Sequence, residues 1–274
     1  WTPVNTGTAT SLVIEDPTIG IDIPAGEQVI IEITVRLRDT ATNVAGLQFS
    51  NTALITYNQL DNDIATQLTG ESSTTAAMTI VEPNLTMTKS GPLQMRIAVP
   101  ETFTLDVHNS GDSPAYNLTI SDLLPNETDG GMCDVAPSQI TAQVFAADGV
   151  TPVSAVLVDG SDYTAVFAGD PSCSLTLTML NSASAIGIDE HLIVTYQTEL
   201  DADSVENTPL TNVAGATEWF SLDVEDAAAL GYARDYDRVL TDGTINVVDH
   251  EDAHTILIFT PTLIFEKYAV NLTS

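Results

Sequence analysis

Basic residues are scarce in this sequence. Its 274 residues include seven lysines and arginines against 38 aspartates and glutamates, which gives a formal net charge of −31. A charge of this sign and size repels nucleic acids and anionic membrane surfaces, and it favours cations or a salty medium. We therefore exclude nucleic acid as a partner and expect an acidic, well-solvated surface.

Long apolar runs are also missing. The most apolar stretch, residues 256–270, is interrupted by Pro261, Glu266 and Lys267, so it falls short of the roughly 20 apolar residues that span a bilayer. Helical periodicity is nearly absent as well, and residues 225–232 are the one short candidate. The sequence therefore predicts no membrane insertion of this segment and no helical core.

An alternation of apolar and polar residues takes the place of helical periodicity. It runs through residues 28–37, 50–57, 102–107 and 192–200, between segments rich in Gly, Pro, Asn, Asp and Ser. A period of two is typical of strands with one buried face, and a 43% apolar content is enough for ordinary cores. The pattern predicts an all-β fold built from antiparallel β-sandwiches.

Internal repeats organise the chain. Residues 1–37 align without a gap over residues 164–200, and residues 78–89 align over residues 256–267. Similarity at such spacings indicates copies of one structural unit. The repeats also mark where one unit ends and the next begins, because each copy of the second stretch carries a proline between two apolar runs.

The repeats predict three parts: the C-terminal portion of one repeat at 1–82, a complete repeat at 83–258, and the first strand of a further repeat at 259–274. A partial sandwich leaves its apolar face uncovered. We therefore expect the missing strands to come from adjoining repeats or from other copies of the protein, by strand complementation.

The two lysines of the chain, Lys89 and Lys267, occupy the same position of the repeated stretch. By the two-residue period, Lys89 shares the apolar face of Leu85 and Met87. A lysine that faces a core costs several kcal/mol unless it is paired. Lys89 therefore needs a partner inside the sandwich.

Two polar residues lie on apolar faces in the same way. Asp122 shares the face of Leu118 and Ile120, and Asn212 shares that of Leu210 and Ala214, whereas Asp106 alternates away from its apolar neighbours and is expected to face solvent. An amine, a carboxyl and a carboxamide in one core suggest a reaction. The Lys89 amine attacks the Asn212 side chain while Asp122 shuttles protons, and ammonia leaves behind an intramolecular isopeptide bond.

The alternative is non-covalent: Lys89 forms a salt bridge with Asp122, and Asn212 caps a turn. Asn51 and Lys267 are the equivalents of Asn212 and Lys89 in the partial repeats. In a polymer, Lys267 of one copy could serve Asn51 of the next, although continuous polypeptide is the simpler account.

These motifs resemble the Ig-like repeat of bacterial and archaeal surface proteins known as domain of unknown function eleven. The resemblance covers the complete repeat and, more weakly, both partial ones. It rests on Leu85-Thr86-Met87-Thr88-Lys89, Asn109-Ser110-Gly111-Asp112-Ser113-Pro114-Ala115, Ile120-Ser121-Asp122-Leu123-Leu124-Pro125 and Thr211-Asn212-Val213-Ala214. It implies immunoglobulin-like sandwiches, one complete and two partial, in secreted cell-surface proteins. The segment 130–170 is longer than its counterpart in the short form of that family. We expect the additional length to form an extra hairpin or a contact surface.

Two modifications typical of extracellular proteins are predicted. Cys133 and Cys173 form an even pair, which in a secreted repeat indicates a disulfide. Sequons for N-glycosylation occur at four positions, and the one at residue 117 is expected to face outward because it is out of phase with Leu118 and Ile120. The four sequon asparagines are Asn84, Asn117, Asn126 and Asn271.

Signals for an enzyme or a metal site are weak. His250-Glu251-Asp252-Ala253-His254 matches the zinc-protease pattern, but it lies between strand-like runs with no room for the required helix. We interpret it as a polar turn. Asp235, Asp237 and Asp242 are candidate calcium ligands, although their spacing does not fit an EF-hand. His108 and His191 have no nucleophile at a motif spacing.

The sequence therefore predicts a non-enzymatic structural segment of an extracellular filament, sheath or adhesin stalk on a prokaryotic surface. It needs no cofactor, and calcium is the one ion for which candidate ligands are apparent. The alternative is a binding module that recognises a glycan, a surface or calcium through its insertion loops.

Overall fold

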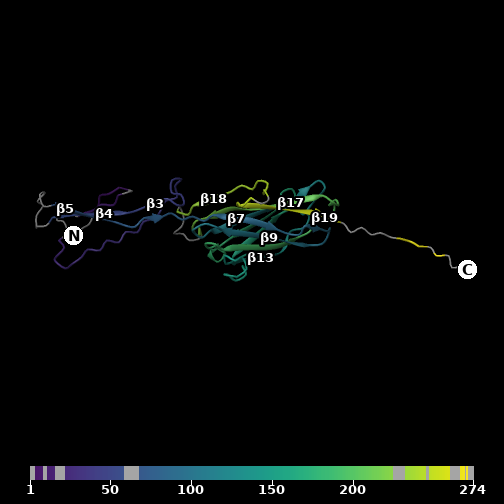
Figure 1. Ribbon diagram of the computed structural model, residues 1–274, viewed down its shortest axis with the longest axis horizontal. Helices are drawn as coiled ribbons and strands as arrows, with labels where there is room; N and C mark the ends of the chain where they lie inside the picture. Colours follow the sequence, from purple (N-terminus) through teal and green to yellow (C-terminus); the bar gives the residue numbers. More distant parts are fainter. Residues whose placement is uncertain are drawn as a thin grey trace. The chain divides into compact units, whose positions relative to one another are not determined.

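The computed structural model describes residues 4–8, 11–15, 22–58, 68–224, 232–244, 247–259, 266–268 and 270 (Figure 1). The chain divides into two compact units, Trp1–Leu37 and Arg38–Ser274. In the described part of the first unit, two short strands, β1 (Val4–Asn5) and β2 (Ile14–Glu15), pair antiparallel. The fold is all-β, and the sandwich that carries the candidate site lies in the second unit.

One layer of the sandwich is a four-stranded antiparallel sheet with the order β13-β16-β9-β7. Side chains on its strands alternate between buried and partly exposed, which is what the two-residue period requires of a sheet with one covered face. Its strands are β7 (Leu85–Ser90), β9 (Glu101–Asn109), β13 (Ser138–Phe145) and β16 (His191–Thr198).

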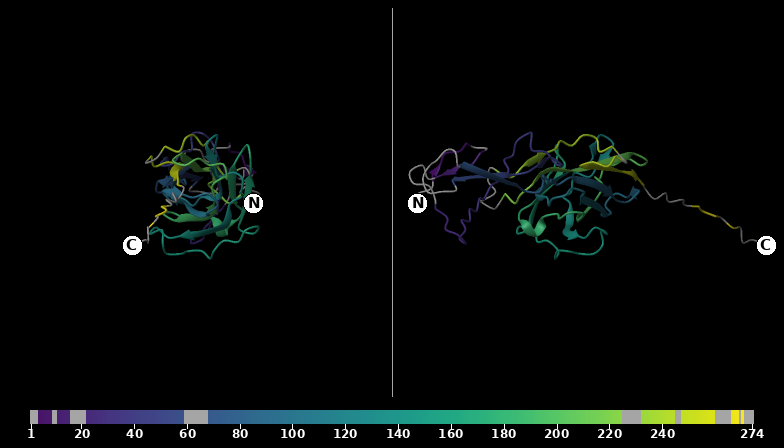
Figure 2. Two further views of the ribbon diagram at one scale, coloured as in Figure 1. Left: turned by 90° about the vertical axis from the view of Figure 1, so that its right-hand side faces the viewer. Right: turned by 60° about the vertical axis from the view of Figure 1, so that its left-hand side comes forward.

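The second layer has the order β14-β15-β10-β17-β19-β8, with β18 beside β17. Figure 2 shows the strands of the sandwich from two further sides. All pairings in the second layer are antiparallel except that of β19 with β8. Its strands are β8 (Gln94–Met95), β10 (Tyr116–Leu123), β14 (Tyr163–Ala168), β15 (Ser174–Met179), β17 (Pro209–Phe220), β18 (Asp235–Asp237) and β19 (Glu251–Ile258).

The inner faces of the two sheets form one hydrophobic core. Its largest fully buried side chains come from both layers, among them Phe103 and Tyr196 from the four-stranded sheet and Trp219 from the larger one. Strands of the sandwich therefore extend from Leu85 to Ile258. The boundaries at 82/83 and 258/259 remain a prediction.

Smaller elements complete the second unit. A hairpin N-terminal to the sandwich consists of β3 (Gln48–Phe49), β4 (Thr52–Asn58), β5 (Leu68–Thr74) and β6 (Met78–Thr79), with β4 pairing β5 and β3 pairing β6. The sandwich also carries the two-residue strands β11 (Asn126–Glu127) and β12 (Gly130–Gly131) and the 3-10 turn η2 (Ser182–Ser184). Within the described residues, no helix has the length and apolarity needed to cross a lipid bilayer.

Two structural expectations need correction. Residues 28–37 alternate as a strand does, yet they form none, and Ile30 and Val35 are exposed, because no neighbouring strand among the described residues pairs with them. Residues 130–170 form more than the expected extra hairpin, although Phe145 and Pro152 do form an antiparallel bridge there; the expected role of this segment as a contact surface remains a prediction. The segment contributes β13 and β14, which are edge strands of the two sheets, and buries Val144 and Tyr163 in the core. The candidate helix falls largely on residues 225–231, outside the described residues.

An arginine beside β18 holds a distant segment of the second unit. Arg234 donates hydrogen bonds from Nε to Asp39 Oδ1 (2.7 Å), from Nη2 to Thr40 O (2.8 Å) and from Nη1 to Glu82 Oε1. The planar guanidinium suits this set of oxygens, because its donors point in fixed and different directions. Arg234 therefore joins the segment that precedes β3 to the sandwich.

We expect Arg234→Ala to loosen that segment. Hydrogen bonds to a charged group contribute about 1.5 to 3 kcal/mol, but partly exposed pairs contribute less, so the local opening free energy falls by about 1 to 2 kcal/mol. Hydrogen exchange followed by mass spectrometry should show faster exchange in residues 38–47. Arg238→Ala is the matched control. It also removes a guanidinium, but one that stacks on Trp219. Unchanged exchange in Arg234→Ala would contradict the tether.

Candidate functional site

A lysine and an aspartate meet between the two sheets. Lys89 comes from β7 of the four-stranded sheet and Asp122 from β10 of the larger one, and Lys89 Nζ lies 2.6 Å from Asp122 Oδ2. Both side chains are fully buried. The alternation of each strand places them there, since Leu85 and Met87 on β7 and Ile120 on β10 are also buried. The predicted pairing of Lys89 with Asp122 is thus present.

Asn212 reaches the same cluster from β17, the neighbour of β10. Asp122 lies opposite Ala214 in the β10–β17 register, and Asn212 lies one inward-facing position before Ala214. The side chain of Asn212 is completely buried. The structure therefore brings the three predicted residues together from three strands, and Asn212 lies within β17, where it caps no turn.

Tyr196 of β16 connects the lysine to the asparagine. Its hydroxyl oxygen accepts hydrogen bonds from Lys89 Nζ (3.1 Å) and from Asn212 Nδ2 (2.8 Å). The ring of Tyr196 stacks on Phe103 at 5.7 Å between centroids, and Lys89 Nζ lies 5.4 and 5.5 Å from the Tyr196 and Phe103 ring centroids. One oxygen thus holds the amine and the carboxamide in adjacent positions, inside an aromatic wall.

Two oxygens of this cluster have no hydrogen-bond partner among the described residues. They are Asp122 Oδ1 and Asn212 Oδ1, and both are buried. Unpaired buried oxygens are costly. The cluster therefore contains two buried acceptor oxygens without a donor among the described residues.

Burial shifts the two titratable groups around the ion pair. Desolvation lowers the pKa of the Lys89 amine, and the negative charges of Asp122 and Asp252 only partly oppose this. Burial also raises the pKa of the Tyr196 hydroxyl well above its usual value, with the Asp122 charge as the next cause. Tyr196 therefore keeps its proton, while the neutral form of the Lys89 amine becomes more accessible.

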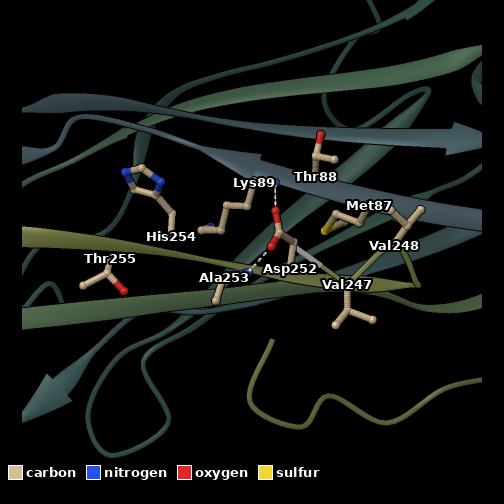
Figure 3. Close-up of a pocket in the computed structure, with 9 residues that line it drawn as sticks. All are labelled: Met87, Thr88, Lys89, Val247, Val248, Asp252, Ala253, His254 and Thr255. Atoms are coloured by element: carbon tan, nitrogen blue, oxygen red, sulfur yellow. Dashed lines mark hydrogen bonds between the residues drawn. The ribbon is translucent and has the colours of Figure 1, made fainter. Parts of the chain in front are cut away.

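A cavity lies outside this cluster, between β7 and β19 (Figure 3). The Asp252 carboxylate reaches across it, accepting hydrogen bonds from the backbone amides of Lys89 (2.8 Å) and Ala253 (2.9 Å). Asp252 thereby occupies a backbone donor of the outer edge of β7, which would otherwise be open to another strand. The lining residues are Met87, Thr88, Lys89, Val247, Val248, Asp252, Ala253, His254 and Thr255.

The equivalents in the partial repeats are not buried. Lys267 and Asn51 are both exposed. Residues on the same face as Asn51 are exposed as well, as Ile55 and Tyr57 show. Neither residue therefore belongs to a core cluster in this chain, and their role as repeat equivalents of Lys89 and Asn212 remains a proposal.

The predicted disulfide is present. Cys133 and Cys173 are bonded, with 5.2 Å between their Cα atoms, which is within the range that disulfides require. The bond closes a loop that contains β13 and β14.

The sequons differ in accessibility. Asn84 and Asn126 are exposed, whereas Asn271 lies outside the described residues. The expectation that Asn117 faces outward is wrong: Asn117 is buried, with Oδ1 accepting from Val224 N (3.0 Å) and Nδ2 donating to Leu180 O (3.4 Å). A β-bulge with φ of 48° at this residue breaks the two-residue period. Its amide is therefore unsuited to carry a glycan.

The zinc-protease pattern has no helix. Glu251 begins strand β19, so the expected polar turn is also wrong for most of the pattern. The two imidazoles contact separate backbone carbonyls, His250 that of Val239 (3.1 Å) and His254 that of Pro92 (2.8 Å). The Glu251 carboxylate accepts hydrogen bonds from the amide and hydroxyl groups of Thr241. The pattern thus belongs to the packing of β19.

Two of the three calcium candidates lie together. Asp235 and Asp237 on β18 gather with Glu218 of β17, with one ligand oxygen of each within 4.8 Å of the others. Burial raises the pKa values of Glu218 and Asp235, and so do the neighbouring carboxylates. Asp242 is not part of this group and accepts a hydrogen bond from Thr244. Sequence reasoning missed Glu218, because it comes from a different strand.

Comparisons with known proteins find weak similarities to solved structures. No family model and no curated protein matches the sequence. Similar solved structures include the collagen-binding domain of a Staphylococcus aureus adhesin, at 11% identity over 62% of this chain and 96% of that one, with a TM-score of 0.33. The full-length major pilin SpaD of Corynebacterium diphtheriae is 12% identical over 83% of this chain and 64% of that one, with a TM-score of 0.34.

An enzyme is among the similar structures as well. AvmM, which catalyses macrocyclization in alchivemycin A biosynthesis, is 10% identical over 66% of this chain and 93% of that one, with a TM-score of 0.35. The all-β, two-layered architecture of this chain rests on its own strand pairings.

Proposed function

We propose that this chain is a structural repeat segment of a secreted prokaryotic cell-surface filament, sheath or adhesin stalk, tied internally by an isopeptide bond between Lys89 and Asn212. The observation that carries the proposal is the fully buried Lys89–Asp122 pair, joined to Asn212 through the Tyr196 hydroxyl. A segment tied in this way performs no turnover, because the reaction occurs once during folding.

The proposed reaction begins with a proton transfer from the Lys89 ammonium to Asp122, which the desolvation of Lys89 favours. Lys89 Nζ then attacks Cγ of Asn212, while the protonated Asp122 donates to Asn212 Oδ1. The bond between Cγ and Nδ2 breaks as the bond between Cγ and Nζ forms. Asp122 passes the proton released by Nζ to the departing Nδ2, which leaves as ammonia.

The bond would connect the first strand of the sandwich to a late one in the opposite sheet. Lys89 is on β7 and Asn212 is on β17, so the covalent path bypasses most of the strands between them. Pulling on the two ends of a repeat could not then separate β7 from β17. That property suits a fibre or stalk under tension, in which repeats are linked end to end.

Intact-mass spectrometry tests the bond. We expect the reduced and deglycosylated chain to be lighter than its sequence mass by about 17 Da, the mass of one ammonia. Lys89→Ala and Asn212→Ala should each restore the full mass. Lys267→Ala and Asn51→Ala are the matched controls, because these residues have the same types and are exposed. An unshifted mass in the wild-type chain would sink the isopeptide bond.

Tyr196→Phe should slow bond formation while keeping the aromatic wall. The change removes one acceptor shared by Lys89 Nζ and Asn212 Nδ2. Loss of about 1.5 to 3 kcal/mol of positioning slows the reaction by about 10- to 100-fold. A time course of cell-free synthesis followed by intact mass measures the rate. Tyr163→Phe, which removes the hydroxyl of a different buried tyrosine, should react at the wild-type rate, and equal rates in all three proteins would remove Tyr196 from the mechanism.

A binding module is the second candidate, and the Glu218–Asp235–Asp237 group is the observation that favours it. Electron microscopy of the purified chain separates the two. Regular fibres without added ligand support a structural role, whereas monomers that retain calcium or a glycan support binding.

A further inference from the structure

Two of the four histidines lie directly opposite each other on the solvent face of the four-stranded sheet. His108 is on β9 and His191 is on β16, and they are partners in the antiparallel register. The adjacent amide of Asn109 bonds to Glu190 O, so the histidine pair occupies a non-hydrogen-bonded position, where side chains of neighbouring strands are closest. Their rings lie 4.4 Å apart between centroids at an angle of 16°.

From this juxtaposition we propose that His108 and His191 bind a divalent transition-metal ion of the zinc, nickel and copper class. Imidazole nitrogen is a preferred ligand for these ions. Two imidazoles held by paired strands form a chelate whose backbone is already ordered before the ion arrives. The side chains remain accessible, with 33% of His108 and 18% of His191 exposed.

A carboxylate orients one of the two rings. Asp106 Oδ1 lies 2.7 Å from His191 Nδ1, and Asp106 is two residues before His108 on the same face of β9. With the proton on Nδ1 donated to this carboxylate, Nε2 of His191 carries the lone pair that a metal requires. A carboxylate behind a metal-binding histidine fixes the ring and increases its basicity.

A further oxygen ligand is within reach of the other ring. Asp189 Oδ1 lies 4.0 Å from His108 Nε2, and the Asp189 side chain is 69% exposed, so a rotation about its side-chain bonds can bring it closer. Two nitrogens and one oxygen leave the remaining position of a tetrahedral ion to water. The net charge of −31 adds a field that attracts cations to the surface.

This pair differs in chemistry from the Glu218–Asp235–Asp237 group. That group offers only carboxylate oxygens, which suit calcium or magnesium, whereas the histidine pair offers nitrogen. The two kinds of ion can therefore be used to distinguish the sites in one experiment. Excess calcium occupies carboxylate groups and leaves the imidazoles available to nickel or zinc.

Isothermal titration calorimetry of the full chain with nickel chloride, in buffer with excess calcium chloride, tests the site. We expect one nickel ion per chain, a loss of saturable binding in His108→Ala and in His191→Ala, and unchanged binding in His250→Ala. Asp106→Asn should bind about 10- to 100-fold more weakly, the usual effect of removing a carboxylate behind a ligand. Wild-type affinity in both His108→Ala and His191→Ala would overturn the proposal, as would the absence of a saturable step.

A measurement on the unmodified chain guards against variants that fail to fold. Zinc is diamagnetic, so its addition can be followed by the NMR signals of the four histidine rings. We expect the signals of His108 and His191 to shift with saturation and those of His250 and His254 to stay in place. Shifts of His250 and His254 instead would place the ion elsewhere and overturn the proposal.

Discussion

Lys89→Ala is expected to lower the free energy of unfolding of the sandwich by about 3 to 5 kcal/mol, the usual cost of removing one partner of a buried ion pair. In the unbonded chain, the fully buried Asp122 would lose its cation. In the bonded chain, the change would remove the proposed connection between Lys89 and Asn212. Urea unfolding followed by tryptophan fluorescence measures the change, because Trp219 lies in the core of the same sandwich. Lys267→Ala, at an exposed lysine, should stay within about 0.5 kcal/mol of wild type.

A double variant distinguishes an ion pair from a covalent bond. Replacing a buried pair by apolar residues of similar volume is often neutral or stabilising, so Lys89→Met with Asp122→Leu should recover most of the stability if the pair is only ionic. If the isopeptide bond forms, the double variant stays less stable than wild type because the covalent connection between β7 and β17 is missing. Recovery above the wild-type value, together with an unshifted wild-type mass, would contradict the proposed bond.

The residues of the candidate site were predictable where one strand alone decides a side chain's direction. Lys89, Asp122 and Asn212 each lie at an inward position of an alternating run, and the structure buries all three. Tyr196 was open to the same reasoning, since it shares the buried face of Leu192 and Val194. A tyrosine on an apolar face looks like ordinary core, however, and its role appears only from hydrogen bonds to residues on other sheets and strands.

The predicted direction of a side chain is wrong where the backbone departs from regular strand geometry. At Asn117 a bulge with positive φ turns the side chain to the face opposite to the predicted one. No short pattern in the sequence predicts this bulge. The histidine pattern that begins at His250 gives the complementary case. Its spacing matches the zinc-protease motif, but that motif needs a helix, so the flanking strand-like runs predict a polar turn. The register of β19 with β17 makes most of the pattern a strand instead.

The alternation of apolar and polar residues also does not predict which strands pair with each other. Residues 28–37 alternate as well as β9 does, yet among the described residues only β9 has a strand on each side. Likewise, His108 and His191 are far apart in sequence and become neighbours only through the β9–β16 register. Long-range register is fixed by the whole sandwich, so features that depend on it could not be assigned from local periodicity.

Reduction of the Cys133–Cys173 disulfide is expected to lower the free energy of unfolding by roughly 3 to 4 kcal/mol, the chain-entropy value for a loop of this length; the two cysteines are 40 residues apart. The same loss should follow from Cys133→Ala with Cys173→Ala. Urea unfolding with and without a reducing agent measures it, and the double alanine variant should not respond to the reducing agent. A wild-type midpoint that does not change on reduction would contradict the expected contribution.

The disulfide and the proposed isopeptide bond constrain different parts of the sandwich, so their effects should separate. The disulfide loop contains the edge strands β13 and β14, whereas Lys89 and Asn212 lie on β7 and β17. The Cys133 turn also has non-covalent support, because Asp201 Oδ1 accepts hydrogen bonds from the amides of Cys133 and Asp134, both at 2.8 Å. Reduction should therefore increase hydrogen exchange mainly in β13 and β14 while β7 and β17 stay protected. Lys89→Ala should reverse that order, and loss of protection in the same strands by both changes would show that the two ties act on one cooperative unit.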